Sequence, residues 1–306
     1  MQHVIQVKNL TKKFSNDFIA VNDLSFSVPK GEVFGFLGQN GAGKSTTMRM
    51  LLTLIEPTSG SIDFFGKPLK ENRNFVLKNV GALIEKPDVY KYLTAYENIK
   101  LFAALSGVKK TKKELLQQLA IVGLESRATD KVKNFSQGMK QRLGIAVALV
   151  HNPEVVILDE PTNGLDPQGI ADIRNLIIGL SEEHKKTVIV SSHLLNEIEQ
   201  MATSILIIDK GKKIIEGLKT DLFDPSQTLV SIDTNDNLNA KQILQQTQWQ
   251  PFLQEGEADL KLQLHKNQIP QLIQFLATQP IEVFAIKPIH SLEDYFLKVT
   301  HHVHTI

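Results

Sequence analysis

The 306-residue sequence contains no cysteine and no long uninterrupted run of apolar residues. The absence of cysteine excludes disulfides, thiolate chemistry and cysteine-bound zinc, and it fits a cytosolic protein. Since no apolar run approaches the roughly 18 residues that a membrane span needs, we expect no transmembrane segment. The N-terminal residues 1–7 alternate like a strand and do not read as a signal peptide.

The sequence also has no large excess of positive or negative charge. The 34 Lys and Arg residues against 33 Asp and Glu leave a net charge of +1, which argues against a nucleic-acid binder held by bulk charge. An apolar content of 42% and a charged content of 22% are typical of a globular protein with a sizeable core. The length is enough for one large domain and a small one.

A glycine-rich stretch carries the first functional signal. It follows the apolar run 33–37, which has the length of a buried strand, and precedes the helical pattern 46–54. This layout wraps backbone N–H groups around phosphates, with the lysine reaching the β- and γ-phosphates and the hydroxyl ligating Mg²⁺. The pattern G-x-x-x-x-G-K-[ST] is matched by Gly38, Gln39, Asn40, Gly41, Ala42, Gly43, Lys44 and Ser45, with Thr46 following.

Polar residues follow two apolar strands later in the chain. Asp159 and Glu160 end the run 155–158, and His193 follows the strand expected over 187–190. Strands that alternate with helices and are nearly all apolar predict a parallel sheet covered on both faces, which binds ligands at the carboxyl ends of its strands. At that edge an aspartate can hold Mg²⁺, and Glu160 can polarise a water for attack on a γ-phosphate.

Two further features have more than one interpretation. Phe14 lies about two dozen residues before the glycine loop; it is either a core residue or an aromatic plate for an adenine ring. Ser136 is a natural N-cap of a helix over 137–150, and Gly138 permits close backbone approach, so this helix start is either an ordinary cap or an anion site.

Taken together, these motifs resemble the nucleotide-binding subunit of an ATP-binding cassette (ABC) transporter, over residues 3 to about 220. The resemblance identifies 38–45 as Walker A, 155–159 as Walker B and 163–166 as the D-loop. It makes Glu160 the catalytic glutamate and His193 the switch histidine. The signature motif, usually Leu-Ser-Gly-Gly-Gln, is present as Phe135-Ser136-Gln137-Gly138-Met139, with Met139 in place of the final Gln.

The resemblance implies ATP and Mg²⁺ as cofactors, bound by an α/β P-loop NTPase core of ABC ATPase type. This core has a mostly parallel sheet flanked by helices, an N-terminal antiparallel β subdomain and a helical subdomain over about 86–150. Lys44, Glu160 and His193 are then catalytic, and Ser45, Glu85 and Asp159 are metal ligands. The nucleotide contacts are Phe14, Gly38, Gln39, Asn40, Gly41, Ala42, Gly43, Lys44, Ser45, Thr46, Ser136, Gly138 and Asp166.

The implied partners are a separate integral membrane permease and a second nucleotide-binding subunit in a head-to-tail homodimer; no nucleic acid is expected. The subunit would lie in the cytoplasm, on the inner face of the cell membrane, with residues 85–98 transmitting motion to the permease. A soluble ABC-type ATPase acting on DNA or the ribosome is the rival. It is disfavoured because only about ninety residues separate Lys44 from Ser136, the chain has one cassette, and zinc-binding cysteines are absent.

One departure from the family pattern is informative. Glu85 stands where family members place the Q-loop glutamine. With the stretch 93–98, it resembles the branch that exports or resists bacitracin-like and lantibiotic peptides, although Glu85 could also be a neutral variant in a multidrug exporter.

Composition changes near 219–227, so we expect domains over 1–220 and 221–306. The second reads as strand, helix, two strands, helix, strand and helix, which resembles a small split βαβ module. The tail His301-His302-Val303-His304 could bind metal, but its position favours a frayed terminus.

Overall fold

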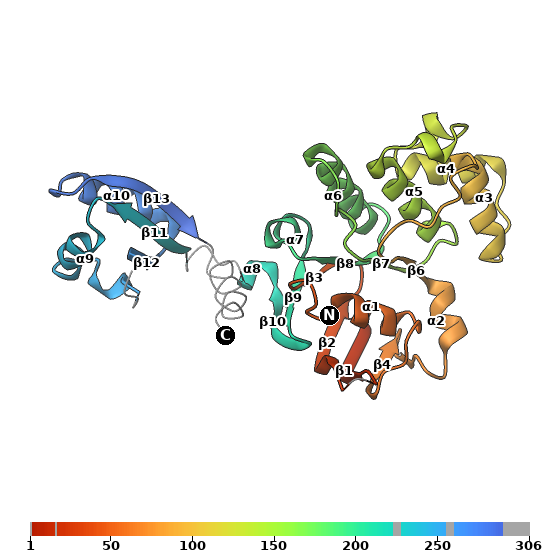
Figure 1. Cartoon of the computed structure of the whole chain (residues 1–306), viewed down its shortest axis with the longest axis horizontal. Coiled ribbons are helices and arrows are strands. Elements are labelled where there is room, and N and C mark those ends of the chain that lie inside the picture. Colours follow the sequence, from red (N-terminus) through yellow and green to blue (C-terminus); the bar gives the residue numbers. More distant parts are fainter. Residues whose placement is uncertain (1, 16, 223–227, 255–259, 290–306) are drawn as a thin grey trace. The chain divides into compact units, whose positions relative to one another are not determined.

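The computed structural model describes residues 2–15, 17–222, 228–254 and 260–289. The chain forms two compact units, Met1–Lys219 and Thr220–Ile306 (Figure 1). The histidine tail at 301–304 and the helix expected after residue 286 lie outside the described residues.

A mixed six-stranded sheet is the centre of the first unit. Its strands are β3 (Val33–Leu37), β6 (Val80–Leu83), β7 (Val155–Leu158), β8 (Thr187–Ser192), β9 (Ser204–Asp209) and β10 (Lys212–Leu218). The order is β10-β9-β3-β8-β7-β6, with all neighbours parallel except β10, which pairs antiparallel with β9. Because β3, β8 and β7 are adjacent, the polar residues after these three strands meet at one edge of the sheet.

An antiparallel sheet with the order β2-β1-β4-β5 lies beside it. Its strands are β1 (His3–Lys13), β2 (Ile19–Pro29), β4 (Ser59–Phe64) and β5 (Lys67–Pro68). The sequence predicts two strands over 18–21 and 24–28, but β2 is continuous. Asp23 adopts the left-handed φ of 55° and the register with β1 shifts around it, so a bulge replaces the expected break.

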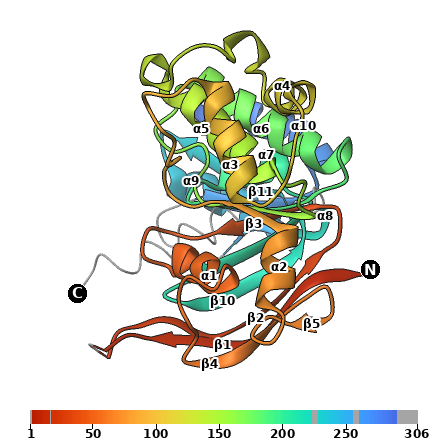
Figure 2. The same cartoon turned by 90° about the vertical axis from the view of Figure 1, so that its right-hand side faces the viewer.

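Helices fill and cover these sheets in layers (Figure 2). The helix α1 (Lys44–Leu51) lies between the two sheets, and its residues Met48, Met50 and Leu51 belong to the shared core. It stops three residues before the predicted end at Leu54; Thr53 has a left-handed φ of 57°. The others are α2 (Arg73–Asn79), α3 (Ala95–Leu105), α4 (Lys112–Ile121), η1 (Glu125–Arg127), η2 (Val132–Asn134), α5 (Gln137–Leu149), α6 (Pro167–Glu182) and α7 (Leu195–Met201). The short helix α8 (Lys219–Leu222) begins at the last residue of the first unit.

The second unit has a three-stranded antiparallel sheet of order β12-β11-β13 with its own apolar core. Where the sequence predicts a further strand between the helices, the described residues show only an isolated bridge between Leu253 and Leu262. The elements are β11 (Thr228–Thr234), α9 (Asn237–Gln245), η4 (Gln250–Phe252), β12 (Leu260–Leu264), η5 (Lys266–Gln268), α10 (Ile269–Ala277) and β13 (Val283–Ile289).

The predicted fold class is confirmed: the first unit has a mostly parallel sheet flanked by helices together with an N-terminal antiparallel sheet, and the second is a small α+β unit.

Candidate functional site

Glycine fixes the loop that joins β3 to α1. Gly41 and Gly43 have φ values of 84° and 103°, which side-chain-bearing residues disfavour. A Cβ on Gly43 would lie 2.5 Å from the carbonyl oxygen of Ala20, so β2 closes tightly against the loop. Gly43 is also the N-cap of α1, so the loop leads directly into the positive end of a helix. Backbone N–H groups and a helix start in this arrangement suit an anion such as a phosphate.

The turn between β9 and β10 holds the same loop from another side. This turn is Lys210–Gly211, with φ values of 46° and 78°. The N–H of Gly211 donates to the carbonyl of Ala42 at 2.9 Å, and its carbonyl accepts from the N–H of Asn22, also at 2.9 Å. One glycine thereby joins the phosphate-type loop to β2.

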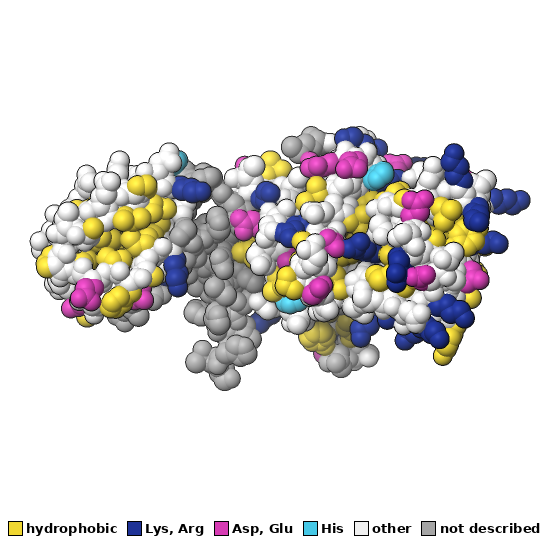
Figure 3. Space-filling view, turned by 90° about the horizontal axis from the view of Figure 1, so that it is seen from above, with side chains coloured by type: hydrophobic (Ala, Val, Ile, Leu, Met, Phe, Trp, Pro, Cys, Tyr) yellow, Lys and Arg dark blue, Asp and Glu magenta, His cyan; other side chains and the backbone are white. Residues whose placement is uncertain are grey.

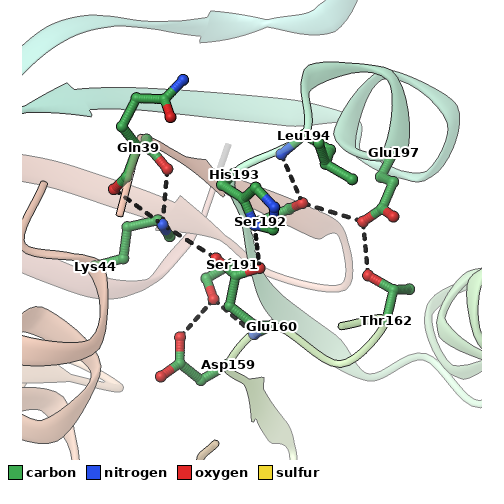
Figure 4. A network of polar contacts seen from close by, with 11 residues as sticks. Gln39, Lys44, Asp159, Glu160, Thr162, Ser191, Ser192, His193, Leu194 and Glu197 are labelled. Atoms are coloured by element: carbon green, nitrogen blue, oxygen red, sulfur yellow. Dashed lines mark hydrogen bonds and ion pairs between the residues drawn. The ribbon is translucent and has the colours of Figure 1, made fainter. Parts of the chain in front are cut away.

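Lys44 lies under the loop with only 5% of its surface exposed. Its Nζ donates to the carbonyl oxygens of Gly38 at 2.7 Å and Gln39 at 3.3 Å, and it forms an ion pair with Glu160 Oε1 at 3.1 Å (Figure 4). The ammonium is therefore fixed at the loop and has one carboxylate counterion. A phosphate bound by the loop would compete with Glu160 for this charge.

The ends of β7 and β8 supply the other polar groups. Asp159 is 1% exposed, and its Oδ1 accepts from the Ser191 hydroxyl at 2.6 Å. Ser191 Oγ in turn accepts from the Glu160 N–H at 2.9 Å, and Glu160 has a left-handed φ of 49°. The other oxygen of Glu160, Oε2, lies 2.8 Å from His193 Nδ1. Lys44, Glu160 and His193 thus form one chain of polar contacts (Figure 4).

A second, buried network stands behind this chain. Glu197 on α7 is 7% exposed, and its Oε2 accepts from the Thr162 hydroxyl at 2.6 Å and the Ser192 hydroxyl at 3.1 Å. Ser192 Oγ accepts from the Leu194 N–H at 3.0 Å. The carboxylate therefore ties the turn after Glu160 to the two residues that flank His193 (Figure 4).

The predicted signature and D-loop residues lie in a different place. Ser136 is the N-cap of α5 and accepts from the Met139 N–H at 3.2 Å, and Asp166 is the N-cap of α6 and accepts from the Gly169 N–H at 3.1 Å. Both line a groove of about 570 Å³ whose walls come wholly from residues 123–172. An ion pair between Arg142 and Asp172 crosses the same lining. Its lining residues are Gly123, Leu124, Arg127, Ser136, Gln137, Gly138, Met139, Arg142, Gly164, Leu165, Asp166, Gln168, Gly169 and Asp172.

The structure does not place Glu85 with the other expected metal ligands. Its carboxylate is 60% exposed and forms an ion pair with Arg49 in the last turn of α1. Within the described ranges, no three His, Asp or Glu side chains gather as a group that could hold a metal ion. Ser45, half-buried in the first turn of α1, and Asp159 remain as one hydroxyl and one carboxylate at the loop edge of the sheet.

Phe14 follows β1 in the turn before β2 and is 39% exposed, so it is not a core residue. Lys12 Nζ lies 5.3 Å from its ring centroid. The strand β2, which begins five residues later, touches Gly43 through Ala20. The ring is therefore exposed in the turn that leads into β2, and its role as a stacking plate stays a prediction.

Sequence reasoning assigned no role to Ser191, Ser192, Thr162, Glu197 or Arg49. The two serines stand at the end of a buried strand next to His193, and that position was the available signal. Nothing in the local sequence identifies the other three, because their partners are distant. Thr162 and Glu197 bond each other across 35 residues, and Arg49 pairs with Glu85 across 36.

The family model of the ABC transporter matches residues 21–163 of the chain. The chain is 41% identical to the uncharacterized ABC transporter ATP-binding protein YhcH of Bacillus subtilis (strain 168), over 98% of this chain and 97% of that protein. It is 40% identical to the bacitracin transport ATP-binding protein BcrA of Bacillus licheniformis, over 98% of each chain. With the lantibiotic transport ATP-binding protein SrtF of Streptococcus pyogenes it shares 41% identity over 78% of this chain and 99% of SrtF.

Among solved structures, the chain resembles the ATP-binding cassette MJ0796, a dimeric structure of a post-hydrolysis state bound to ADP and Pi. The TM-score is 0.64 at 27% identity, over 70% of this chain and 98% of MJ0796. Among the helices that our structure describes, none combines the length and apolar character of a membrane span.

Proposed function

The chain belongs to the ATP-binding subunits of ABC transporters, and we propose that it hydrolyses ATP–Mg²⁺ in a head-to-tail homodimer that drives a separate permease. The proposal gives the subunit a place on the cytoplasmic face of the cell membrane, held there by that permease. The cargo we propose is a bacitracin-like peptide antibiotic or another drug, moved outward.

The separation of two half-sites is the observation that carries the dimer. Lys44, Glu160 and His193 meet at the edge of the mixed sheet, whereas Ser136 and Asp166 line a groove built from residues 123–172. In the proposed dimer, the loop of one copy faces this groove of the other, and each of two ATP molecules lies between them. The MJ0796 structure, a dimer bound to ADP and Pi, supports a dimer for a chain of the same fold.

The residues present fit ATP and Mg²⁺. The loop offers backbone donors and a buried ammonium, and Phe14 offers an exposed ring for the adenine. Ser45 and Asp159 offer a hydroxyl and a carboxylate oxygen, the sparse donor set with which Mg²⁺ binds in company with phosphate oxygens. When bound, Mg²⁺ neutralises charge on those phosphate oxygens. Glu85 could join this set only after its ion pair with Arg49 opens.

The chain's own groups then act as follows. Lys44 holds its charge at the phosphate end of the loop. Glu160 accepts the proton of the attacking water, and its carboxylate is oriented by His193 at 2.8 Å. Ser191 fixes Asp159 and the backbone of Glu160 with one hydroxyl. Ser136 and Gly138 of the partner copy close the site and exclude bulk water.

Mixing two inactive variants tests the shared site. Lys44→Ala and Ser136→Ala should each abolish hydrolysis alone. In an equal mixture, half of the dimers are mixed and each of these keeps one intact site, so about a quarter of the parental rate should return. A single chain carrying both substitutions, mixed with either variant, is the matched control and restores nothing. If the equal mixture also stays inactive, the site is not shared between copies.

The general base is tested by Glu160→Gln, with Glu183→Gln at the exposed C-cap position after α6 as control. We expect Glu160→Gln to lower the turnover roughly 10²–10⁴-fold and to trap an ATP-bound dimer in gel filtration. Hydrolysis at the parental rate by this variant would remove Glu160 from the mechanism.

As the cargo, a bacitracin-like peptide is favoured over a lantibiotic because the match to the bacitracin protein covers more of this chain. The similarity to BcrA runs through both units, whereas SrtF matches only 78% of this chain. Tagged protein purified from detergent-solubilised membranes should bring down a polytopic permease, and the strain should lose bacitracin tolerance without it. Recovery of ribosomes or nucleic acid in place of a membrane protein would favour the soluble ATPase instead.

A further inference from the structure

Positive charge is concentrated in one part of this nearly neutral chain. Residues 86–150 contain 12 Lys and Arg against 5 Asp and Glu, a net charge of +7, whereas the rest of the chain carries 22 against 28, a net charge of −6. In the space-filling view, Lys and Arg side chains gather at the end of the first unit that holds α3 and α4 (Figure 3). A chain with an overall charge of +1 thus has one strongly cationic end.

The densest part of this end runs from the segment after α3 into the first turn of α4. Lys109, Lys112 and Lys113 are exposed and Lys110 is half-buried, and we call these four residues the lysine loop. In the part of the chain that the structure describes, none of the four forms an ion pair. The charge of Lys110 also acts on a neighbour. Burial lowers the pKa of Lys186, the attraction of Glu154 partly offsets this, and repulsion from Lys110 lowers the pKa further.

The position of these lysines is unfavourable for the fold. Lys112 and Lys113 are the first two residues of α4, where the positive end of the helix repels cations. The acidic residue in this turn, Glu114, is held by Thr111 in a capping box, with its carboxylate on the Thr111 N–H at 2.7 Å. An external anion bound at this end of the helix would offset that repulsion.

An exposed apolar side chain and a shallow hollow lie next to the lysine loop. Leu105, at the end of α3, is 68% exposed. A shallow hollow of about 540 Å³ is lined by Lys112, Lys113, Leu116, Gln117 and Glu125. Apolar side chains among flexible ammonium groups suit the boundary between lipid headgroups and acyl chains.

We infer that the lysine loop binds the anionic surface of the membrane directly, alongside the permease. Lysine ammonium groups are point charges on long flexible stems. Four of them suit a diffuse layer of lipid phosphates better than they suit a single carboxylate in a fixed position. This contact would fix the orientation of α3 and α4 relative to the bilayer. It does not depend on the hydrolytic role of the site, because no residue of that site takes part.

Vesicle sedimentation with the full chain, in the absence of any permease, tests the inference. The protein should bind vesicles of phosphatidylcholine and phosphatidylglycerol, bind pure phosphatidylcholine weakly, and release as salt rises. Replacing all four lysines with Gln should weaken binding to anionic vesicles about five-fold per lysine. The all-Arg variant keeps the charge and should bind within about two-fold of the parent.

The matched control replaces the exposed Lys8, Lys70, Lys78 and Lys212, which lie outside residues 86–150, and should bind like the parent. Equal loss in both Gln variants would mean that only net charge matters, and this overturns the inference. So would parental binding by the lysine-loop variant, or equal binding to neutral vesicles. The inference is also overturned if the protein does not bind vesicles and the lysines are needed only for recovery of the permease. That result would assign the surface to an acidic protein partner. Thermal melts of all variants exclude misfolding as the cause.

Discussion

Glu197 gives the sharpest quantitative expectation, because one buried carboxylate oxygen accepts from two hydroxyls. Replacing Thr162 with Val keeps the shape of the side chain and removes the shorter of these hydrogen bonds, at 2.6 Å. A hydrogen bond to a charged group contributes about 1.5–3 kcal/mol, so Thr162→Val should lower the free energy of unfolding of the first unit by about 2 kcal/mol. For a unit of 219 residues this corresponds to roughly 4–8 °C in melting temperature.

Ser192→Ala should cost about the same, since it removes a donor to Glu197 and the acceptor of the Leu194 N–H. The two hydroxyls share Oε2, so the double variant should depart from additivity by about 0.5 kcal/mol or more. Urea unfolding measures all three. The ATPase rate should also fall, since both changes loosen the segment that holds His193.

The control is Thr203→Val, whose hydroxyl lies on the exposed surface of the same unit, 3.1 Å from Glu32 Oε2 and 3.0 Å from the Val33 carbonyl oxygen. It should cost less than about 1 kcal/mol, because water replaces the lost partner. If Thr162→Val proves no more costly than Thr203→Val, the buried network does not stabilise the fold and the reasoning fails.

Three further outcomes follow from single contacts. Burial lowers the pKa of His151, whose Nε2 lies 3.1 Å from the Val80 carbonyl and whose Nδ1 is buried without a partner. The unfolded chain therefore binds this proton more readily, so stability should decline as the pH falls below about 6.5, by at most about 1.4 kcal/mol per pH unit, and His151→Gln should flatten that slope in urea unfolding. Gly43→Ala should abolish ATP binding in a calorimetric titration, since φ is 103° and the new Cβ would lie 2.5 Å from the Ala20 carbonyl; parental affinity would contradict the described loop. Phe14→Ala should weaken ATP binding by about 1–3 kcal/mol while Phe14→Trp retains it, and equal affinity for all three chains would exclude stacking.

Much of the fold was predictable because the relevant signals are local. The strand 155–158 has the predicted bounds, and the helix expected over 137–150 begins as predicted after its Ser136 cap and ends one residue early, since the cap and the apolar runs lie within each segment. The strand-end rule also indicated that Asp159, Glu160 and His193 would meet.

What the sequence could not predict depends on pairing between distant segments. The continuity of β2 through Asp23 requires β1 as a template, since the Asp23 side chain accepts from Asn9 Nδ2. The ion pair of Glu85 with Arg49 joins α1 to the segment after β6 across a separation of 36 residues. The buried network of Glu197 joins three segments that share no pattern.

The turn at Lys210–Gly211 limits where the chain can accept insertions during evolution. Two-residue hairpin turns on a surface usually tolerate insertions, because few contacts constrain their tips. Here both backbone groups of Gly211 are engaged, one by Asn22 and the other by Ala42. A single added residue would release β2 and the phosphate-type loop together. Among homologues, we therefore expect insertions and deletions to be rarer at this hairpin than in the other surface loops of the first unit.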